Sequence, residues 1–443
     1  MTDARGIQRR LRGFGNYPAI DAWELRSDAL ASSTEQAVLS RGLGRSYGDA
    51  ALPPADSARP VATTDLADRL LEFEPESGLL RAEAGLSLAE LARVFLPQGW
   101  FTPVSPGTAH VTLGGMVAAD VHGKNHHRAG TLGQHVESLR MRVASGRVLD
   151  VSRREEPELF RATLGGMGLT GHILEVVLRL ERVPSAWIWR ESEQVSDAAA
   201  LLWALREAGR DWPMTVGWLD TSHARGRGIV MRGRWAAVEE APPAQPRAPR
   251  APGVPFMAPR GLANRYTIGI ANAFWYTVHG ATPRAGLVTP HSWFWPLDAI
   301  RDWPRAYGPR GFTQYQCLIP YDAALLTELL ARFRRAGGSS FVTVVKDCGA
   351  QGEGLLSFPK PGVTLALDIP IHPTRTRALV DQLNELVLEH GGRIYLAKDA
   401  FTRPEHFRAM YPELGAWLEL RRKWDPDRRI SSAQSRRLLG DDG

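Results

Sequence analysis

Residues 106–135, PGTAHVTLGGMVAADVHGKNHHRAGTLGQH, are the stretch that decides the fold of this chain. The stretch is rich in glycine and histidine, and Asp120 is its only acidic residue. Glycine lets a backbone approach a ligand closely, and free backbone N–H groups and basic side chains hold phosphate oxygens. The stretch therefore predicts a site for a bound, negatively charged cofactor.

The 443 residues suffice for two sizeable cores, and a content of 44% hydrophobic and 23% charged residues indicates a globular protein. No run of about 18 apolar residues is present, so no transmembrane helix is expected. The N-terminal MTDARGIQRRLRGFG lacks the apolar core of a secretion signal. With only Cys317 and Cys348, we expect no disulfide framework and a cytoplasmic location.

The net charge of +6 permits anionic partners such as phosphate groups, nucleic acid or a membrane surface. The arginines alternate with acidic residues instead of forming one basic stripe. We therefore expect no nucleic-acid partner.

Strand and helix patterns alternate over residues 35–182, which predicts an α+β region. The expected elements are a strand at 79–85, a helix at 87–99 with Ser87 as N-cap, a hairpin at 138–152 and a strand at 172–183.

The composition changes near Pro184, and residues 237–260 are dense in proline and alanine, which predicts a mobile loop. Around that loop we expect helices at 197–209 and 375–390 and strands at 312–320, 341–347 and 365–372. From Gly391 the chain changes again, to a basic, helical tail.

Two glycine motifs lie in the first region. Residues 42–49, GLGRSYGD, are not a dinucleotide fingerprint, because the spacing is wrong and no helix can follow. They predict either a tight turn or a nest of backbone N–H groups around a phosphate. Residues 166–171, GMGLTG, fit G-x-G-x-x-G, but a strand follows. They predict a turn that lies against a flat ligand or another strand.

Four histidines, His122, His126, His127 and His135, raise the question of a metal. Gly123 interrupts a helix between the first two, and no nearby Cys, Asp or Glu completes a ligand set. We expect no metal, with some of these histidines solvated or hydrogen-bonded to backbone.

Gln314 and Gln316 lie two apart on an expected strand, so they share one face, while Tyr315 and Cys317 share the other. The polar face is either a hydrogen-bonding wall for a polyhydroxylated ligand or a sheet face open to water. Lys346 ends an apolar strand, a position that often faces a cleft. Lys398 with Asp399 is by itself most often a solvated surface pair.

Taken together, GLGRSYGDA, PGTAHVTLGGMVAADVHGKNHH, GGMGLTG, YLAKDA and MYPELGAWLELRRKWDPDRRISS resemble the decaprenylphosphoryl-β-D-ribose 2-oxidase family. These enzymes belong to the vanillyl-alcohol-oxidase or PCMH type of FAD protein. The resemblance runs from about residue 10 to the C-terminus and is thinner from 186 to 310.

The resemblance implies an α+β fold. A two-part PCMH-type FAD-binding domain would comprise residues 1–184 and 393–443. Residues 185–392 would form a substrate domain with an antiparallel sheet flanked by helices, and its loop at about 237–262 would be a mobile lid.

The resemblance also implies residue roles. Lys398, Tyr47 and His122 would be catalytic. The substrate would contact Gln314, Gln316, Lys346, Thr364 and Tyr395. The FAD would be bound by Gly42, Gly44, Arg45, Ser46, Tyr47, Gly48, Gly107, Thr108, Thr112, Gly114, Gly115, His122, Gly123, Lys124, Asn125, Gly168, Gly171, Ile173 and Lys398.

Relatives with covalent FAD commonly carry histidine where this chain has Arg45, so FAD is expected to be bound non-covalently. Mycobacterial members have a cysteine where this chain has Ala366 and an asparagine where it has Thr364; Cys348 stands where an aromatic residue is expected. The loss of that cysteine predicts insensitivity to cysteine-trapping inhibitors.

The implied activity is oxidation of the 2-hydroxyl of a polyprenylphosphoryl ribose to a 2-keto sugar, the first half of a ribose-to-arabinose epimerisation. A separate NAD-dependent keto-reductase would complete it. The lipid substrate implies contact with a membrane surface, with the protein cytoplasmic or peripheral at the inner face. Oxidation of a soluble sugar, alditol or aldonolactone is a second hypothesis, and a non-catalytic flavin-binding scaffold a third.

Overall fold

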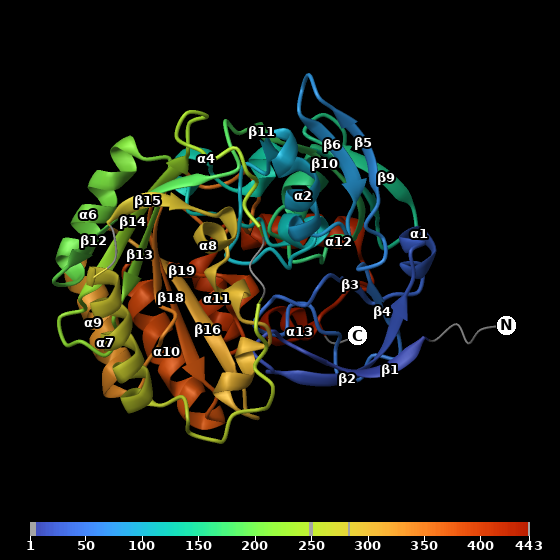
Figure 1. Ribbon diagram of the computed structural model, residues 1–443. Helices are drawn as coiled ribbons and strands as arrows, with labels where there is room; N and C mark the ends of the chain where they lie inside the picture. The colour runs from blue at the N-terminus through green and yellow to red at the C-terminus, as the bar shows by residue number, and fades with distance from the viewer. Residues whose placement is uncertain (1–5, 248–250, 282–283, 442–443) are drawn as a thin grey trace.

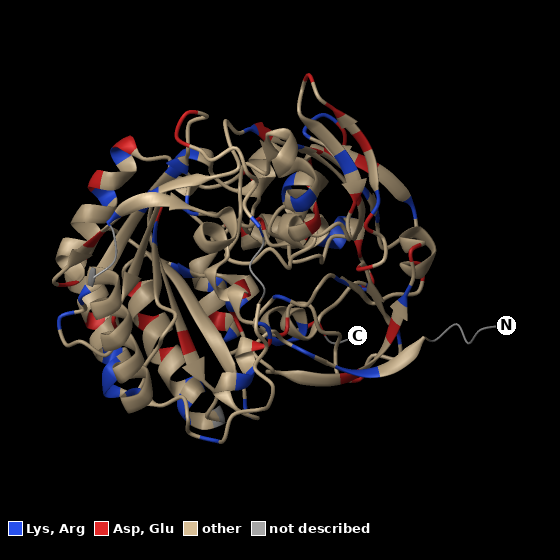
Figure 2. Cartoon of the chain, viewed as in Figure 1, with Lys and Arg blue, Asp and Glu red and all other residues tan. Residues whose placement is uncertain are grey.

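The computed structural model describes residues 6–247, 251–281 and 284–441. The chain forms two lobes that lie side by side, one built on an eight-stranded sheet and the other on two smaller sheets (Figure 1). Acidic and basic residues are interleaved along both lobes, as the sequence indicates (Figure 2).

The smaller sheets are formed by the N-terminal part of the chain. A four-stranded sheet has the order β1-β2-β4-β3, with parallel pairing of β4 to β2 and to β3. A five-stranded antiparallel sheet has the order β5-β6-β10-β8-β9. The strands are β1 Ile7–Arg12, β2 Ala19–Arg26, β3 Leu39–Arg41, β4 Val61–Thr63, β5 Leu70–Glu74, β6 Leu79–Glu83, β8 Val136–Arg142, β9 Val148–Ser152 and β10 His172–Arg179.

Short helices pack against these sheets. Ser87 caps the first long one, α2, by accepting a hydrogen bond from the backbone of Glu90, which confirms the predicted N-cap. Thr112 caps α3 in the same way through Gly115. The helices are α1 Leu30–Ser33, α2 Leu88–Phe95, α3 Leu113–Ala118, α4 His126–Ala129 and α5 Pro157–Thr163, with 3-10 turns η1 Leu96–Gln98 and η2 Leu132–His135.

The strand expected over 172–183 is divided into two. β10 ends at Arg179, and β11 (Glu181–Arg182) pairs instead with β7 (Trp100–Phe101). The hairpin of 138–152 is confirmed by β8 and β9, which pair antiparallel on either side of the Ser145–Gly146 turn.

The large sheet is antiparallel throughout, in the order β15-β12-β14-β13-β17-β18-β16-β19. Its strands are β12 Ile188–Val195, β13 Met214–Leu219, β14 Gly228–Trp235, β15 Ala285–Val288, β16 Phe312–Ile319, β17 Val344–Cys348, β18 Gly362–Pro370 and β19 Arg393–Ile394. β19 pairs with β16, so this sheet continues past residue 392, the expected end of the substrate domain.

One face of the large sheet is covered by α6 (Ala198–Asp211), α9 (Ala323–Arg335) and α10 (Pro373–Glu389) (Figure 1). Leucines of these helices pack on Tyr315, Cys317, Leu365 and Leu367 of the sheet. Gln314, Gln316 and Thr364 alternate with those residues and therefore lie on the opposite face.

The remaining elements surround that opposite face or return to the first lobe. They are α7 Arg265–Ala281, α8 Pro290–Phe294, η3 Pro296–Ala299, η4 Trp303–Tyr307, η5 Leu396–Lys398, α11 Pro404–Met410, α12 Leu414–Trp424 and α13 Ala433–Leu439. The Trp417 indole of α12 donates to the Ala162 carbonyl of α5 at 2.9 Å, so the C-terminal tail packs on the N-terminal lobe.

The proline-rich segment 237–262 has no helix or strand in its described residues, and residues 248–250 lie outside them. Its second half is attached to the large lobe, because the backbone of Val254 donates to Arg301 at 2.9 Å and that of Ala258 to Arg305 at 3.0 Å. Among the described residues no helix is both long and apolar enough to cross a membrane.

Candidate active site

The polar face of the large sheet is closed to water. Gln314 and Gln316 are each only 6% exposed, so the interpretation as an open sheet face is wrong. The Gln314 amide donates to Oδ1 of Asp368 at 2.8 Å. The Gln316 amide nitrogen lies 3.0 Å from Nε2 of His122. The predicted glutamine wall therefore connects the sheet directly to residues 120–127 of the other lobe, the DVHGKNHH segment.

Asp368 was not predicted as a site residue. It is fully buried on β18, and besides Gln314 it accepts a hydrogen bond from the Tyr307 hydroxyl at 3.1 Å. Burial raises the pKa of its carboxyl to about 7, against the stabilising hydrogen bonds of Gln314 and Tyr307. Asp368 is thus poised between its neutral and charged forms at neutral pH.

Lys398 and Tyr47, two residues to which the resemblance gives a catalytic role, lie in contact. The Lys398 ammonium lies 4.0 Å from the centre of the Tyr47 ring. The Tyr47 backbone donates to the Ala397 carbonyl at 3.0 Å. Gly48 is required there, because a Cβ at this position would lie 1.6 Å from the Asp399 carbonyl oxygen.

The Lys398–Asp399 segment is not a solvated surface pair. Asp399 is buried and accepts from Arg437 at 2.8 Å, and Arg437 also pairs with Asp49 at 2.7 Å. Burial, and next the charge of Lys346, lower the pKa of Lys398 to about 7. Burial raises the pKa of Tyr47 well above its ordinary value.

Lys346 lies on the same side of β17 as this cluster. Burial lowers its pKa to about 8, and its charge contributes to the lowered pKa of His122, Lys124 and Lys398. Thr364 pairs directly opposite Lys346 and is buried. No ion pair between Lys124, Lys346 or Lys398 and a carboxylate is formed within the described parts of the chain.

Within the described residues, no group of three or more His, Cys, Asp or Glu side chains that could hold a metal ion includes the histidines of 122–135. His122 and His126 are buried, and burial lowers the pKa of both, that of His126 to about 4. His126 accepts from the Gly349 backbone at 3.1 Å, while His127 and His135 lie at hydrogen-bond distance from the carbonyls of Trp212 and Ala129.

Tyr395 closes this corner of the site. Its hydroxyl donates to the Ala119 carbonyl at 3.0 Å, and its ring stacks on Phe358 at 4.7 Å and lies 5.7 Å from the His122 ring. His122 is therefore fixed between Gln316 and two aromatic rings.

The turn at residues 42–49 and the stretch at residues 106–124 lie in contact. Arg45 Nε donates to the His110 carbonyl at 3.0 Å, and the Arg45 guanidinium lies over the Phe14 ring at 4.9 Å. The Ser46 carbonyl accepts from the backbone of Phe14 at 2.8 Å. The turn at 42–49 thus lies beside the 106–124 stretch.

Some residues that are expected to bind the cofactor form hydrogen bonds with other residues of the protein. The Thr108 hydroxyl donates to Asp298 at 2.8 Å, and the Asn125 amide donates to the Pro103 carbonyl at 2.7 Å. The Lys124 ammonium donates to the Trp293 carbonyl and lies over its ring, 4.6 Å from the centre. Ile173 is buried in the core of the first lobe, opposite Met141.

The predicted glycines differ in what surrounds them. A Cβ would collide with protein at Gly42, Gly44, Gly48, Gly114, Gly123 and Gly171, and at Gly115 it would lie 3.1 Å from Thr112 Oγ1. At Gly107 and at Gly168 a Cβ would meet nothing within 4 Å, and Gly168 has a φ of +77°. These two glycines border open space, whereas the others lie against neighbouring side chains or backbone.

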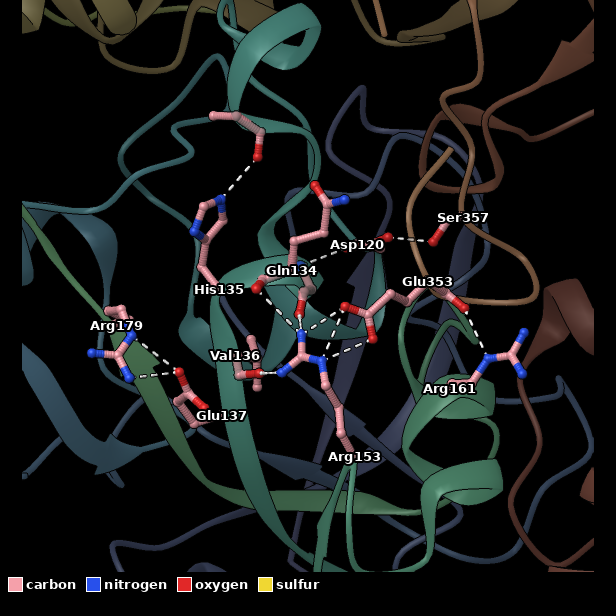
Figure 3. A network of polar contacts seen from close by, with 12 residues as sticks. Asp120, Gln134, His135, Val136, Glu137, Arg153, Arg161, Arg179, Glu353 and Ser357 are labelled. Atoms are coloured by element: carbon pink, nitrogen blue, oxygen red, sulfur yellow. Dashed lines mark hydrogen bonds and ion pairs between the residues drawn. The ribbon is translucent and has the colours of Figure 1, made fainter. Parts of the chain in front are cut away.

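A second junction between the lobes lies at Asp120, two residues before His122. Asp120 is fully buried, accepts from the Gly133 backbone at 2.8 Å and from the Ser357 hydroxyl. Close by, Arg153 contacts the Val136 carbonyl at 2.7 Å and pairs with Glu353 at 2.8 Å (Figure 3). Residues 353–357 of the large lobe are thereby fixed against the DVHGKNHH segment.

These features fit FAD. Gly168 is half-buried, and no atom lies within 4 Å of the position of a Cβ there, which leaves room beside the backbone for a flat or phosphorylated group. Lys124, Lys346 and Lys398 supply cations whose pKa values are lowered by burial and which form no ion pair with a carboxylate among the described residues. Such cations favour an anionic ligand over water.

The fold and the site define a FAD-dependent oxidoreductase. Residues 28–152 match the FAD binding domain family, and residues 364–438 match the D-arabinono-1,4-lactone oxidase family. The second match contains Asp368, Tyr395 and Lys398.

The chain belongs to the decaprenylphosphoryl-β-D-ribose oxidase family. It is 35% identical over 414 residues to the decaprenylphosphoryl-β-D-ribose oxidase of Mycolicibacterium smegmatis, which covers 90% of this chain and 89% of the relative. It is also 27% identical over 161 residues to the D-arabinono-1,4-lactone oxidase of Yarrowia lipolytica, covering 34% of this chain and 30% of that enzyme.

Proposed function

We propose that the protein oxidises the 2-hydroxyl of a polyprenylphosphoryl ribose to a 2-keto sugar. The name of the Mycolicibacterium relative supports the sugar and its lipid carrier. The observation that carries the chemistry is Lys398, whose pKa of about 7 combines with a position beside Tyr47. Bound FAD would accept the hydride from the carbinol carbon.

Lys398 is the residue that we assign to the hydroxyl proton. A base must take this proton as hydride leaves, and it works best when its pKa lies near the working pH. Lys398 meets that condition, because its amine is about half unprotonated at pH 7 with a pKa of about 7. Tyr47 does not, since burial raises its pKa well above the ordinary value and keeps its proton on. Tyr47 instead holds the Lys398 ammonium over its ring.

The polar sheet face would orient the sugar. Gln314 and Gln316 present amides from one strand, and Asp368 adds a carboxyl that donates when protonated and accepts when ionised. Thr364 and Tyr395 would complete this wall. The hydrogen bonds of this wall would present one hydroxyl of the ribose to Lys398.

Lys346 would bind the substrate phosphate. With a pKa of about 8 it is mostly protonated at neutral pH, and a phosphate dianion beside it would raise that pKa further. The same contact would remove part of the repulsion between Lys346 and Lys398. Substrate binding therefore couples to the protonation of the base.

The FAD would be bound non-covalently, by the glycine-rich stretches that contain Gly107 and Gly168. Arg45 occupies the turn position at which covalent relatives carry histidine, and its side chain is engaged by His110 and Phe14. A guanidinium cannot form the flavin bond of an imidazole. His122, held by Gln316, would lie beside the reactive part of the flavin.

In this proposal the enzyme performs the first half of a ribose-to-arabinose epimerisation, and a separate NAD-dependent reductase consumes the keto sugar. The lipid carrier places the reaction at a membrane surface, on the cytoplasmic side. The segment 237–262, attached to residues 301–305, would act as the lid.

A second candidate is oxidation of a soluble sugar, alditol or aldonolactone. The match of residues 364–438 to the D-arabinono-1,4-lactone oxidase family favours it, because that segment contains Asp368 and Lys398.

Anaerobic flavin reduction tests both candidates. The purified protein is mixed without oxygen with a polyprenylphosphoryl ribose, with free ribose or with an aldonolactone, and bleaching of the flavin is followed. We expect fast bleaching by the lipid-linked sugar only. Fast bleaching by the lactone alone would replace the first proposal with the second, and a yellow protein that no substrate bleaches would indicate a flavin-binding scaffold.

A further inference from the structure

Helix α7 (Arg265–Ala281) presents apolar side chains to solvent along one side. Tyr266, Ile270, Phe274 and Val278 recur every four residues, which places them in one stripe, and Leu262 continues this spacing before the helix. Ile270 is 73% and Phe274 69% exposed, and Trp275 next to the stripe is exposed as well. We call these six residues the α7 apolar face. A helix of a soluble domain normally turns such a stripe toward the core.

The inner side of α7 is already occupied. Ile268 and Asn272 are buried, and the Asn272 amide donates to Asp220 Oδ1 at 3.0 Å and to the Ser340 carbonyl at 3.2 Å. The Tyr276 carbonyl accepts from Gln194 at 2.7 Å. The helix is therefore fixed with its apolar face outward, and the core has no use for that face.

The helix lies on the same face of the large sheet as the site. Directly paired residues share a face, and one row of paired residues crosses the sheet from Gln194 through Ile229, Trp218, Val344 and Ala366 to Gln316. Ser340 links the two regions, because it accepts from Asn272 through its carbonyl and from the Asp368 backbone through its hydroxyl, at 2.9 Å. The α7 apolar face therefore lies at the border of the substrate side.

The charge of the surrounding sequence is of one sign. Residues 241–297 contain no Asp or Glu, and they contain the arginines Arg247, Arg250, Arg260, Arg265 and Arg284. The four of these that the structure describes are exposed, and none forms an ion pair with a described residue. Elsewhere the chain interleaves both signs (Figure 2).

We propose that α7 is an interfacial helix, which lies in the surface of an anionic lipid bilayer. Its apolar face enters the acyl boundary, the aromatic Tyr266, Phe274 and Trp275 sit at headgroup depth, and the flanking arginines contact lipid phosphates. This inference rests on the proposed function, in which the substrate is a membrane lipid, and it names where the enzyme meets the membrane. A bilayer at α7 would deliver that lipid to the polar face of the sheet.

Vesicle co-sedimentation of the FAD-loaded enzyme, without substrate, tests the proposal. The vesicles are phosphatidylcholine alone or phosphatidylcholine with phosphatidylglycerol. We expect binding to the anionic vesicles, reduced by high salt, and at least about tenfold weaker binding for the double variant Ile270→Ser/Phe274→Ser. Reversal of charge by Arg260→Glu/Arg265→Glu should weaken binding to anionic vesicles selectively.

Trp203→Ser is the matched control. Trp203 is 68% exposed on α6, the helix on the other face of the sheet, so its replacement removes a large exposed apolar side chain without touching α7. FAD content and thermal midpoint verify that each variant is folded. Equal vesicle binding by wild type and the α7 variants, or an equal loss for Trp203→Ser, would overturn the proposal.

Two other outcomes also overturn it. Dimers that the α7 substitutions abolish, with no vesicle binding, would assign the face to a second copy of the chain. Unchanged vesicle binding with a raised KM for long-chain substrate only would assign it to the prenyl chain. Because binding is measured without substrate, its failure is distinct from a failure of flavin reduction, which a short-chain, water-soluble substrate would report.

Discussion

The two faces of the large sheet are built from the same strands and have opposite characters. On β16 and β18 the residues Tyr315, Cys317, Leu365 and Leu367 point into the helix-covered core. Their neighbours Gln314, Gln316, Thr364 and Asp368 point to the FAD-binding lobe and are equally buried. Successive residues of one strand therefore divide between packing and chemistry, because the side chains of a strand alternate.

The polar face costs more free energy of folding than the helix-covered face, because it buries polar and charged groups. A buried polar group must be hydrogen-bonded to avoid a penalty of about 1–3 kcal/mol, and here Gln314 bonds to Asp368 and Gln316 lies at hydrogen-bond distance from His122. The lysines are not paired with carboxylates, and their lowered pKa values record that cost. The helix-covered face stabilises the fold, and burial of the polar face offsets part of that stabilisation.

The sharpest test of this division is Lys398→Ala. Loss of a general base typically slows catalysis by about 10²–10⁴-fold, so single-turnover flavin reduction should fall by that factor while the absorbance of bound FAD remains. Lys423→Ala is the control, since Lys423 is an exposed lysine whose ion pair with Glu158 is also exposed. Full activity of Lys398→Ala would remove Lys398 from the mechanism.

Leu367→Ala tests the opposite face one residue away from Asp368. Leu367 is fully buried under the helices, and truncation of a buried leucine costs about 2–5 kcal/mol of unfolding free energy. The midpoint of urea denaturation should fall accordingly, while the flavin reduction rate of the folded enzyme stays near that of wild type. A large loss of rate without a loss of stability would contradict the separation of the two faces.

The sequence predicted the alternation of these faces but not the whole site. Gln314 and Gln316 were found because two polar residues interrupt an apolar strand with period two. Asp368 was missed because it lies in the apolar run LALDIPI, and Tyr307 because no local pattern places a residue of a 3-10 turn against a distant strand. Their roles depend on pairings across the sheet and between lobes, which spacing along the chain does not contain.

The glycines show a similar limit. The sequence indicated the stretches 42–49, 106–124 and 166–171, and the structure brings Arg45 of the first against His110 of the second. Only Gly107 and Gly168 of the predicted set border open space. A glycine that admits a ligand and a glycine that admits another backbone look the same in a sequence, because both are selected for the missing Cβ.

A pH profile of Asp368→Asn probes the coupling within the polar face. In wild type the rate of flavin reduction should rise with pH through a midpoint near 7, because Lys398 with its pKa of about 7 must lose a proton to act as base. The Asp368 carboxylate raises that pKa. Its removal should therefore move the midpoint to lower pH by about one unit. A midpoint that stays in place or rises would mean that Asp368 does not act on Lys398.

The smallest effect on activity is expected from thiol reagents. Each face of the large sheet holds one cysteine. Cys317 packs in the helix-covered core and Cys348 beside Phe358 and Tyr395 on the site side. Both are buried free thiols, and burial raises the pKa of each, that of Cys317 to about 12. A thiolate is the reactive form, so neither should be labelled in the native enzyme at neutral pH, and activity should be retained.

The same thiol reagents should distinguish the two faces when the protein is partly destabilised by a low concentration of urea. Cysteine-trapping inhibitors should also leave the enzyme active, because Ala366, which pairs with Gln316 on the site face, offers no thiol there. In low urea we expect Cys348 to be labelled before Cys317, since its face is closed by the other lobe, whereas Cys317 is covered by helices of its own lobe. Mass spectrometry would identify which cysteine is labelled. If Cys317 is labelled first, the helix-covered face opens before the lobes separate, and the assignment of stability to that face would be reversed.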